Sequence, residues 1–261
     1  MSLRVIEWAS IPSDRETGKD RVCESAMTLG VFDGVHLGHQ ELIRRVVDKG
    51  PAPTVITFRE NPKKVISPDN YKGDIYSLRQ KLAAIEKLGV RQVILIDFSP
   101  EFSKLEGREF FNLLGSRVKI SFFAIGSNFR CGYKQDTDAV LIGKINESKG
   151  IPTEIIPQVC TSAGLVSSSR IRDAIFGGNL VFAAGMLGRP LELDLADIPE
   201  QEHRNGLFYD FQSAQRIIPE KGSYPVLLNP GSVRVHAYAE DGKIFLPDKH
   251  TGESFESIEF I

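Results

Sequence analysis

Short apolar runs alternate with helical patterns through the first two-thirds of the chain. The runs that predict strands are residues 26–32, 54–58, 92–97, 121–125 and 153–156. Apolar residues at helical spacing predict helices over residues 39–49, 77–88, 107–114, 140–148, 169–176 and 180–186. Because parallel strands need crossover connections, this alternation favours an α/β fold with a parallel sheet and helices on both faces.

The pattern changes near residue 191. Turn-rich segments such as EHRNGLF and PEKGSYPVLLNPGS then separate short apolar runs, and no helical period is evident. Runs at residues 224–228, 233–239 and 243–246 predict strands. We expect two domains: an α/β domain over residues 1–190 and a small antiparallel β domain over residues 191–261.

The composition is that of an ordinary globular protein, with 41% hydrophobic and 25% charged residues. The net charge of −2 gives no footprint for nucleic acid or an anionic membrane. The sequence shows neither an apolar run of the roughly 20 residues that span a membrane nor a signal peptide. The three scattered cysteines lack disulfide or zinc spacing. We expect a cytoplasmic protein that binds small molecules, as a monomer or weak homo-oligomer.

The stretch TLGVFDGVHLGHQ, residues 28–40, lies where the first strand gives way to a helix. Ligands of parallel sheets bind at the carboxyl ends of strands, and helix N-termini suit phosphate. Gly34 and Gly38 let a ligand come close to the backbone. His36 and His39 can then donate hydrogen bonds to phosphate oxygens. The alternative is a helix start with one surface and one packed histidine, but the strand–turn context favours the phosphate site.

A second candidate anion site is LVSSSRIRDAI, at the start of a predicted helix. Its polar residues are Ser167, Ser168, Ser169, Arg170 and Arg172. Hydroxyls, helix N–H groups and a guanidinium together make a strong oxyanion cradle. The alternative is a serine-capped helix with solvated arginines. This segment alone does not decide between the two.

Four segments resemble, in order and spacing, the bacterial FAD synthetase family of riboflavin kinase/FMN adenylyltransferases. They are GVFDGVHLGHQELI, VITFRENPKKVI, GSNFRCGY and VSSSRIRDAIFGGNLVFAAGMLGRP. The resemblance covers about residues 20–190, and the motifs are highly specific in combination. It implies a Rossmann-like nucleotidylyltransferase domain that converts FMN and MgATP to FAD and pyrophosphate.

The resemblance also implies roles for individual residues. His36 and His39 contact ATP phosphates, Asn128 orients a phosphate or the water shell of the metal, and Ser167, Ser168, Ser169 and Arg170 hold the β- and γ-phosphates. The residues assigned to nucleotide or flavin binding are Gly30, Phe32, Asp33, Gly34, Gly38, Thr57, Asn61, Gly126, Ser169 and Arg172. Mg²⁺ is expected mainly on ATP phosphates and water, with no protein ligand.

The chain departs from the family pattern in three places. Glu60 and Asn61 replace a Pro-His pair, and Asn61 can donate a hydrogen bond but carries no charge. The alternative is that Asn61 only shapes a turn before Pro62. Cys131 stands where an aromatic is common. Residues 191–261 lack the Gly-rich stretch and Pro-Thr-Ala-Asn motif of the kinase domain. We therefore predict a reduced domain without kinase activity, and FMN supplied by another enzyme or by import.

Other functions remain open. Another His-x-Gly-His transferase would act on pantetheine phosphate, nicotinate mononucleotide or glycerol phosphate, but the Phe-Asp-Gly prefix and the Leu-Gly-Arg-Pro ending speak against it. A non-catalytic protein that binds FMN or FAD is favoured only by the altered second motif and the missing kinase signatures. The C-terminal domain can also be interpreted as a degenerate kinase that binds flavin without turnover.

Overall fold

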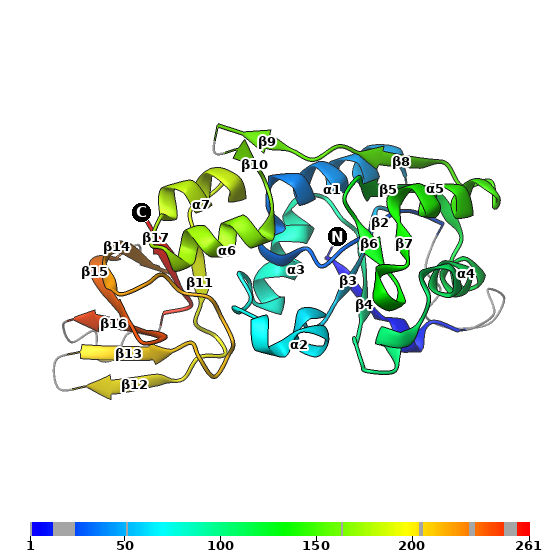
Figure 1. Ribbon diagram of the computed structural model, residues 1–261. Helices are drawn as coiled ribbons and strands as arrows, with labels where there is room; N and C mark the ends of the chain where they lie inside the picture. Colours follow the sequence, from blue (N-terminus) through cyan, green and yellow to red (C-terminus); the bar gives the residue numbers. More distant parts are fainter. Residues whose placement is uncertain are drawn as a thin grey trace. The chain divides into compact units, whose positions relative to one another are not determined.

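The computed structural model describes residues 2–12, 24–50, 52–162, 164–203, 206–229, 233–247 and 255–261. The chain forms two compact units (Figure 1). One contains Met1–Tyr71 and Lys81–Val159, and the other contains Lys72–Gln80 and Cys160–Ile261. This division does not follow the expected boundary at residue 190, because residues 72–80 and 160–190 belong with the C-terminal part. The assignment of separate activities to residues 1–190 and 191–261 stays a prediction.

A six-stranded parallel sheet forms the centre of the first unit, in the order β1-β4-β3-β2-β5-β8. Its strands are β1 (Arg4–Glu7), β2 (Ser25–Leu29), β3 (Thr54–Phe58), β4 (Gln92–Ile96), β5 (Ile120–Gly126) and β8 (Thr153–Ile156). All residues of β2 and β4 are buried, as expected for inner strands of a covered parallel sheet. Because β2 pairs with both β3 and β5, the loops that follow these three strands lie at one edge.

Helices cover both faces of this sheet (Figure 1). They are α1 (Leu37–Lys49), α3 (Leu78–Lys87, from Lys81 onward), α4 (Gly107–Arg117) and α5 (Ala139–Glu147), with a short α2 (Lys63–Ile66) after β3. On one face, α1 packs Leu42 and Val46 against Ala26 of β2. On the other face, α4 and α5 pack against Met27 and Leu29. The alternation of β2 side chains between two apolar clusters confirms the predicted α/β fold.

The second unit contains a seven-stranded antiparallel sheet, in the order β11-β17-β14-β15-β16-β13-β12. Its strands are β11 (Glu192–Asp194), β12 (Glu200–His203), β13 (Gly206–Asp210), β14 (Gly222–Asn229), β15 (Val233–Glu240), β16 (Lys243–Pro247) and β17 (Ser257–Phe260). Buried and partly buried residues alternate along β13 and β16, so one face is covered more fully than the other. The unit also holds a hairpin and two helices: β9 (Cys160–Thr161), β10 (Gly164–Leu165), α6 (Ser168–Phe176) and α7 (Leu180–Leu187). The predicted antiparallel β region is confirmed.

Residues 72–80 are anchored inside the second unit by a buried carboxylate. Asp194 of β11 is 1% exposed and accepts hydrogen bonds from Ser77 Oγ, at 2.5 Å, and from the Arg79 guanidinium. Gln80 Nε2 donates to the backbone oxygen of Glu192 at 2.9 Å. These contacts join positions more than a hundred residues apart, which a pattern of local periodicity does not reveal.

The predicted elements of the α/β region are present, with small shifts at their ends. The strand expected over residues 26–32 ends at Leu29, because the next residues turn into a loop. The first helix begins at Leu37 rather than residue 39, since the preceding residue caps it. Within the parts of the chain that are described, no helix is long and apolar enough to cross a bilayer.

Candidate functional site

The histidine stretch forms a strained loop between β2 and α1. Phe32, Gly34 and Val35 have φ angles of 54°, 73° and 39°. A positive φ is a genuine outlier for a β-branched residue such as valine, and strain of this kind persists only where contacts impose it. Here Val35 N donates to Phe32 O at 3.1 Å, and Gln40 Nε2 donates to Val35 O at 3.0 Å. These two hydrogen bonds stabilise this conformation of the loop.

His36 and His39 come together at the start of α1. His36 caps the helix, because its Nδ1 accepts a hydrogen bond from the His39 N–H at 3.3 Å. The two rings stack with their centroids 3.6 Å apart and their planes at 14°. With Nδ1 accepting, a neutral His36 ring carries its proton on Nε2, where it can donate to an anion. This geometry fits the predicted phosphate site.

Two glycines of the stretch lie so close to aromatic side chains that a Cβ would displace the rings. A Cβ on Gly38 would lie 3.2 Å from His36 Cε1, and a Cβ on Gly30 would lie 3.1 Å from the Phe32 ring. The Phe32 ring in turn lies 4.9 Å from that of His39. Asp33 is buried, with 4% exposure, at the turn between them. These residues therefore shape the loop, and their contacts with a ligand stay predictions.

The second motif is tied to this loop through Thr57. Thr57 is fully buried, and its Oγ1 donates to the backbone oxygen of Val31 at 3.0 Å. Asn61 is 6% exposed, and its Oδ1 accepts a hydrogen bond from Lys63 N at 3.2 Å at the start of α2. The turn-forming role of Asn61 is present in the structure. Its contact with flavin stays a prediction.

The third motif follows β5, the strand that pairs with β2 on its other side. Gly126 ends this strand, and Asn128 is exposed two residues later. Asn128 Oδ1 lies 3.4 Å from the position of a Cβ on Gly126, so a side chain there would crowd the amide. Both residues stand at the sheet edge where β2 and its loop also end, as the sequence predicts.

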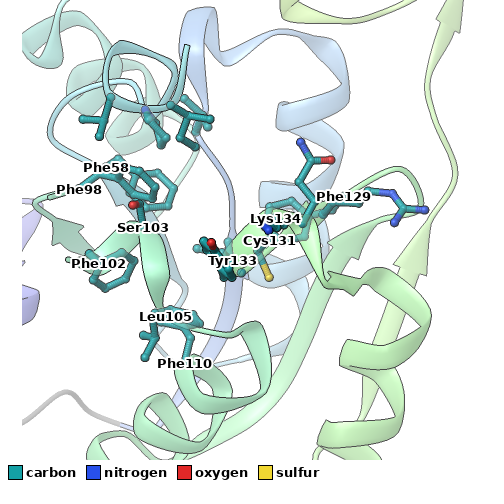
Figure 2. A pocket seen from close by; sticks show the side chains of 18 residues that line it. Phe58, Phe98, Phe102, Ser103, Leu105, Phe110, Phe129, Cys131, Tyr133 and Lys134 are labelled. Carbon is teal, nitrogen blue, oxygen red and sulfur yellow. The ribbon is translucent and has the colours of Figure 1, made fainter. Parts of the chain in front are cut away.

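A cavity of about 470 Å³ lies at this edge of the sheet, within the size range of small-molecule sites. It is lined by Leu29, Val31, Phe58, Pro62, Val65, Ile66, Phe98, Phe102, Ser103, Leu105, Phe110, Phe129, Arg130, Cys131, Gly132, Tyr133, Lys134 and Gln135. In Figure 2, Phe58 and Phe98 lie above Leu105 and Phe110, and Tyr133 lies to their right at an intermediate height. Most of the lining is apolar, and Leu29 and Val31 lead directly into the histidine loop.

One wall of the cavity is a series of aromatic rings in edge-on contact. Phe58 and Phe98 lie 5.5 Å apart, Phe98 and Phe102 lie 5.7 Å apart, and Phe102 and Phe110 lie 5.9 Å apart. Such rings offer faces and edges to a flat aromatic ligand. Sequence reasoning did not single out these residues, although the phenylalanine-rich segment between residues 98 and 111 was the available signal.

The opposite wall belongs to the short hairpin of β6 (Arg130–Cys131) and β7 (Thr137–Asp138). The connection between them is strained, with positive φ angles at Gly132, Lys134 and Gln135. Burial, with a smaller effect of Asp136, raises the pKa of the Cys131 thiol to about 12. Cys131 therefore stays a neutral, apolar lining residue at ordinary pH.

The serine–arginine segment lies in the second unit. Ser167 caps α6, since its Oγ accepts a hydrogen bond from Arg170 N at 3.3 Å. The Arg170 guanidinium donates to the backbone oxygen of Leu165 and lies 5.3 Å from the Phe182 ring. Ser168 is half-buried and Ser169 is exposed. The alternative interpretation, a helix capped by serine, thus holds for Ser167. Phosphate binding by this segment stays a prediction.

Two arginines of the same region hold residues 72–80 in place. Arg172 is 6% exposed, and its Nε donates to the backbone oxygen of Gly73 at 2.8 Å. Arg189, from the Leu-Gly-Arg-Pro ending, donates from Nε to the Tyr76 hydroxyl at 2.7 Å. The structure thus gives Arg172 a contact that stabilises the unit, and its predicted contact with a ligand is not tested.

The comparisons of this sequence with a family model and with known proteins agree on one family. The sequence model described as FAD synthetase matches residues 19–170. Similar curated proteins are the bifunctional riboflavin kinase/FMN adenylyltransferases of Escherichia coli K12 (26% identical, 77% of this chain, 66% of that protein) and Bacillus subtilis 168 (29% identical, 66% of this chain, 56% of that protein). The chain thus spans somewhat less than two-thirds of the length of these relatives.

A solved structure resembles the whole chain. The crystal structure of a macrolide-efflux protein from Streptococcus pneumoniae covers 99% of this chain and 89% of its own length, with a TM-score of 0.80 and 22% identity. At this identity the likeness concerns the fold alone. It extends over the C-terminal β region as well as the α/β part.

Proposed function

The chain belongs to the FAD synthetase family, and from this premise we propose that it is an FMN adenylyltransferase that makes FAD and pyrophosphate from FMN and MgATP. The observation that carries the proposal is the cavity of about 470 Å³ beside the histidine loop, in the same unit. Its aromatic walls suit the flat, largely apolar flavin ring, and the adjoining helix N-terminus suits phosphates.

The reaction asks little covalent chemistry of the protein. An oxygen of the FMN phosphate forms a bond to the α-phosphorus of ATP, while the bond from that phosphorus to the bridging oxygen breaks and pyrophosphate leaves. The second pKa of a phosphomonoester is about 6, so the FMN phosphate is largely dianionic near neutral pH and needs no general base. The protein must align the two substrates and neutralise the charge that develops on the leaving group.

We assign this task first to the start of α1. His36 and His39 bind the ATP phosphates, with the Nε2–H of His36 as one donor. Gly34 and Gly38 keep the backbone open to the nucleotide, and the buried Asp33 lies at the same turn. The observed helix cap and ring stacking support these roles, because they fix both rings on one side of the helix start.

The remaining polar residues complete the assignment. Asn128 orients a phosphate or metal-bound water, and Ser167, Ser168, Ser169 and Arg170 bind the β- and γ-phosphates. Mg²⁺ enters as part of MgATP. Among the described residues, no group of three or more His, Cys, Asp or Glu side chains converges on one point. Phosphates and water are the ligands expected for this ion.

We further propose that the chain lacks riboflavin kinase activity. Residues 191–261 contain neither a Gly-rich stretch nor the sequence Pro-Thr-Ala-Asn. The phosphate of FMN must then come from a separate kinase reaction or from imported FMN. A cytoplasmic location and a monomeric or weakly associated state are part of the same proposal.

The site assignment is tested with His36→Ala and Ser168→Ala. Loss of one donor to a charged transition state costs about 10²-fold or more in kcat, so both variants should lose FAD formation to that extent. His236→Ala is the matched control, because His236 is exposed on β15. The measurement is FAD formation and pyrophosphate release from FMN and MgATP. Unchanged turnover in both site variants would overturn the assignment.

A further inference from the structure

Lys81 is a buried lysine that the proposed reaction does not use. It lies in α3 and is 6% exposed, whereas Lys87 of the same helix is exposed. Taking an ammonium group out of water is costly unless protein atoms replace its hydration. A methionine would fill a similar volume without that cost. Packing alone therefore does not account for a lysine at this position.

The Lys81 ammonium donates a hydrogen bond of 2.6 Å to the backbone oxygen of Phe58. Phe58 is the last residue of β3, and Arg59 N continues the sheet with a hydrogen bond of 2.9 Å to Ile96 O. Hydrogen bonds from charged donors are about twice as strong as those between neutral groups. Lys81 thus fixes the last peptide group of the strand just before the chain leaves the sheet.

Phe58 carries this contact to the cavity. Its ring lines the wall and lies edge-on to Phe98, at 5.5 Å and 82° (Figure 2). A shift of the Phe58 peptide would therefore move the wall on which a flat ligand rests. The histidine loop is held separately, because Thr57 makes its own hydrogen bond to Val31. We therefore expect Lys81 to affect the position of the aromatic wall and to leave the histidine loop in place.

We propose that Lys81 is a positioning residue for the flavin substrate, which acts through the backbone of Phe58. This inference rests on the proposed function, since it takes FMN as the occupant of the cavity. A positioning role through Phe58 affects FMN more than ATP, because the phosphate-binding residues are held by other contacts. If Lys81 had a merely structural role, its substitution would instead lower the stability of the protein and weaken the binding of FMN and of ATP together.

The test uses Lys81→Met and Lys81→Arg, with Lys87→Met as the matched control on the same helix. Calorimetric titration with FMN and steady-state kinetics with both substrates give the Kd and the two KM values. For Lys81→Met we expect the FMN Kd and KM to rise about tenfold, the size of one well-placed contact. The ATP KM should stay within about twofold, the expected scatter for an uncoupled site. Tm should change little, because the relieved burial of the ammonium offsets the hydrogen bond that Phe58 O loses. Lys81→Arg keeps the charge but not the shape of the donor, so its FMN KM should lie between those of the wild type and Lys81→Met.

A Phe58→Leu variant tests whether the effect passes through Phe58. In that background, Lys81→Met should raise the FMN Kd by clearly less than it does in the wild type, because coupled residues are not additive. Independent effects of the two substitutions would overturn the proposed route.

Two further results would overturn the inference. In the first, both Lys81 variants bind FMN with a Kd within about twofold of the wild-type value. In the second, the variants bind FMN and ATP more weakly by the same factor. If Lys81→Met does not fold, Lys81→Arg decides by the same criteria. A wild-type protein that binds no FMN would instead overturn the proposed function, so the two failures are distinguishable.

Discussion

At the start of α1, a substitution at Gly38 tests the position of the His36 ring without a large change in the stability of the helix. A Cβ there would meet His36 Cε1 at 3.2 Å and Nδ1 at 3.3 Å, while alanine is the better helix former by about 1 kcal/mol. Gly38→Ala should therefore displace the His36 ring and leave Tm nearly unchanged, because the gain in helix propensity offsets the weakened His36 cap. Since small misplacements of catalytic groups cost up to about 10²-fold, we expect FAD formation to fall about tenfold or more.

The matched control for this prediction is Gly143→Ala in α5. A Cβ on Gly143 would meet only Ile155 Cδ1, at 3.9 Å, which is an ordinary contact. Gly143→Ala should keep full activity, as measured by the same FAD assay. Equal activity of Gly38→Ala and the wild type would show that the ring position observed at His36 does not matter for turnover.

Much of the histidine site could be predicted from the sequence, because its residues are close together in the chain. The strand, the turn with glycine and the helix start all leave local signals, and these predict that His36 and His39 lie at the start of a helix, where the structure has them. The structural contacts of Thr57 and Arg172 could not be predicted in this way. Their partners, Val31 and Gly73, lie far away in the sequence, and a hydrogen bond to a backbone oxygen leaves no sequence pattern.

Among the elements, β11 contributes a buried carboxylate, Asp194, to the contacts that hold residues 72–80. Burial by itself would raise the pKa of Asp194, but hydrogen bonds from Arg79 and Ser77 outweigh burial and hold the pKa below its usual range. A lowered carboxyl pKa stabilises the folded state above the unfolded pKa, about 3.9, and this stability is lost as the pH falls through the folded value. Asp194→Asn should lower the free energy of unfolding by about 1–3 kcal/mol at pH 7.

The pH dependence of this difference is a separate check. Measured by urea unfolding, the gap between the wild type and Asp194→Asn should be full at pH 6–7 and shrink below about pH 4. Asp173→Asn is the control, because Asp173 forms an exposed ion pair with Lys72, and such pairs contribute about 0–1 kcal/mol. A gap that does not change with pH would contradict the assignment of the stability to the Asp194 charge.

The aromatic cavity shows why element prediction does not yield the whole site. Of the elements that surround it, β3 was predicted at its observed bounds, Thr54–Phe58, whereas α2 and the hairpin of β6 and β7 were not predicted. Its walls, however, combine Phe58, Phe98 and Tyr133, which come from separate loops and strand ends. Only the packed sheet brings these side chains together, so the size and apolar character of the cavity are known from the structure alone.

At the scale of the whole molecule, the chain is divided by contacts rather than by sequence order. Residues 72–80 interrupt the first unit and belong with the C-terminal part, through Asp194, Arg172 and Arg189. The change of composition near residue 191 marks the start of the β sheet, and the compact unit that contains this sheet begins at Cys160. Local composition indicates which type of secondary structure a segment forms. Contacts between distant segments decide which of them belong to one compact unit.

The central claim is that this chain makes FAD from FMN and does not make FMN from riboflavin. Two reactions test it side by side: purified protein with MgATP and FMN, and purified protein with MgATP and riboflavin, each followed by chromatography with fluorescence detection. The account predicts FAD in the first reaction and no new flavin in the second. FMN or FAD in the second reaction would show a working kinase in the chain, and FMN binding without FAD in the first would show a non-catalytic flavin-binding protein; either result would contradict the account.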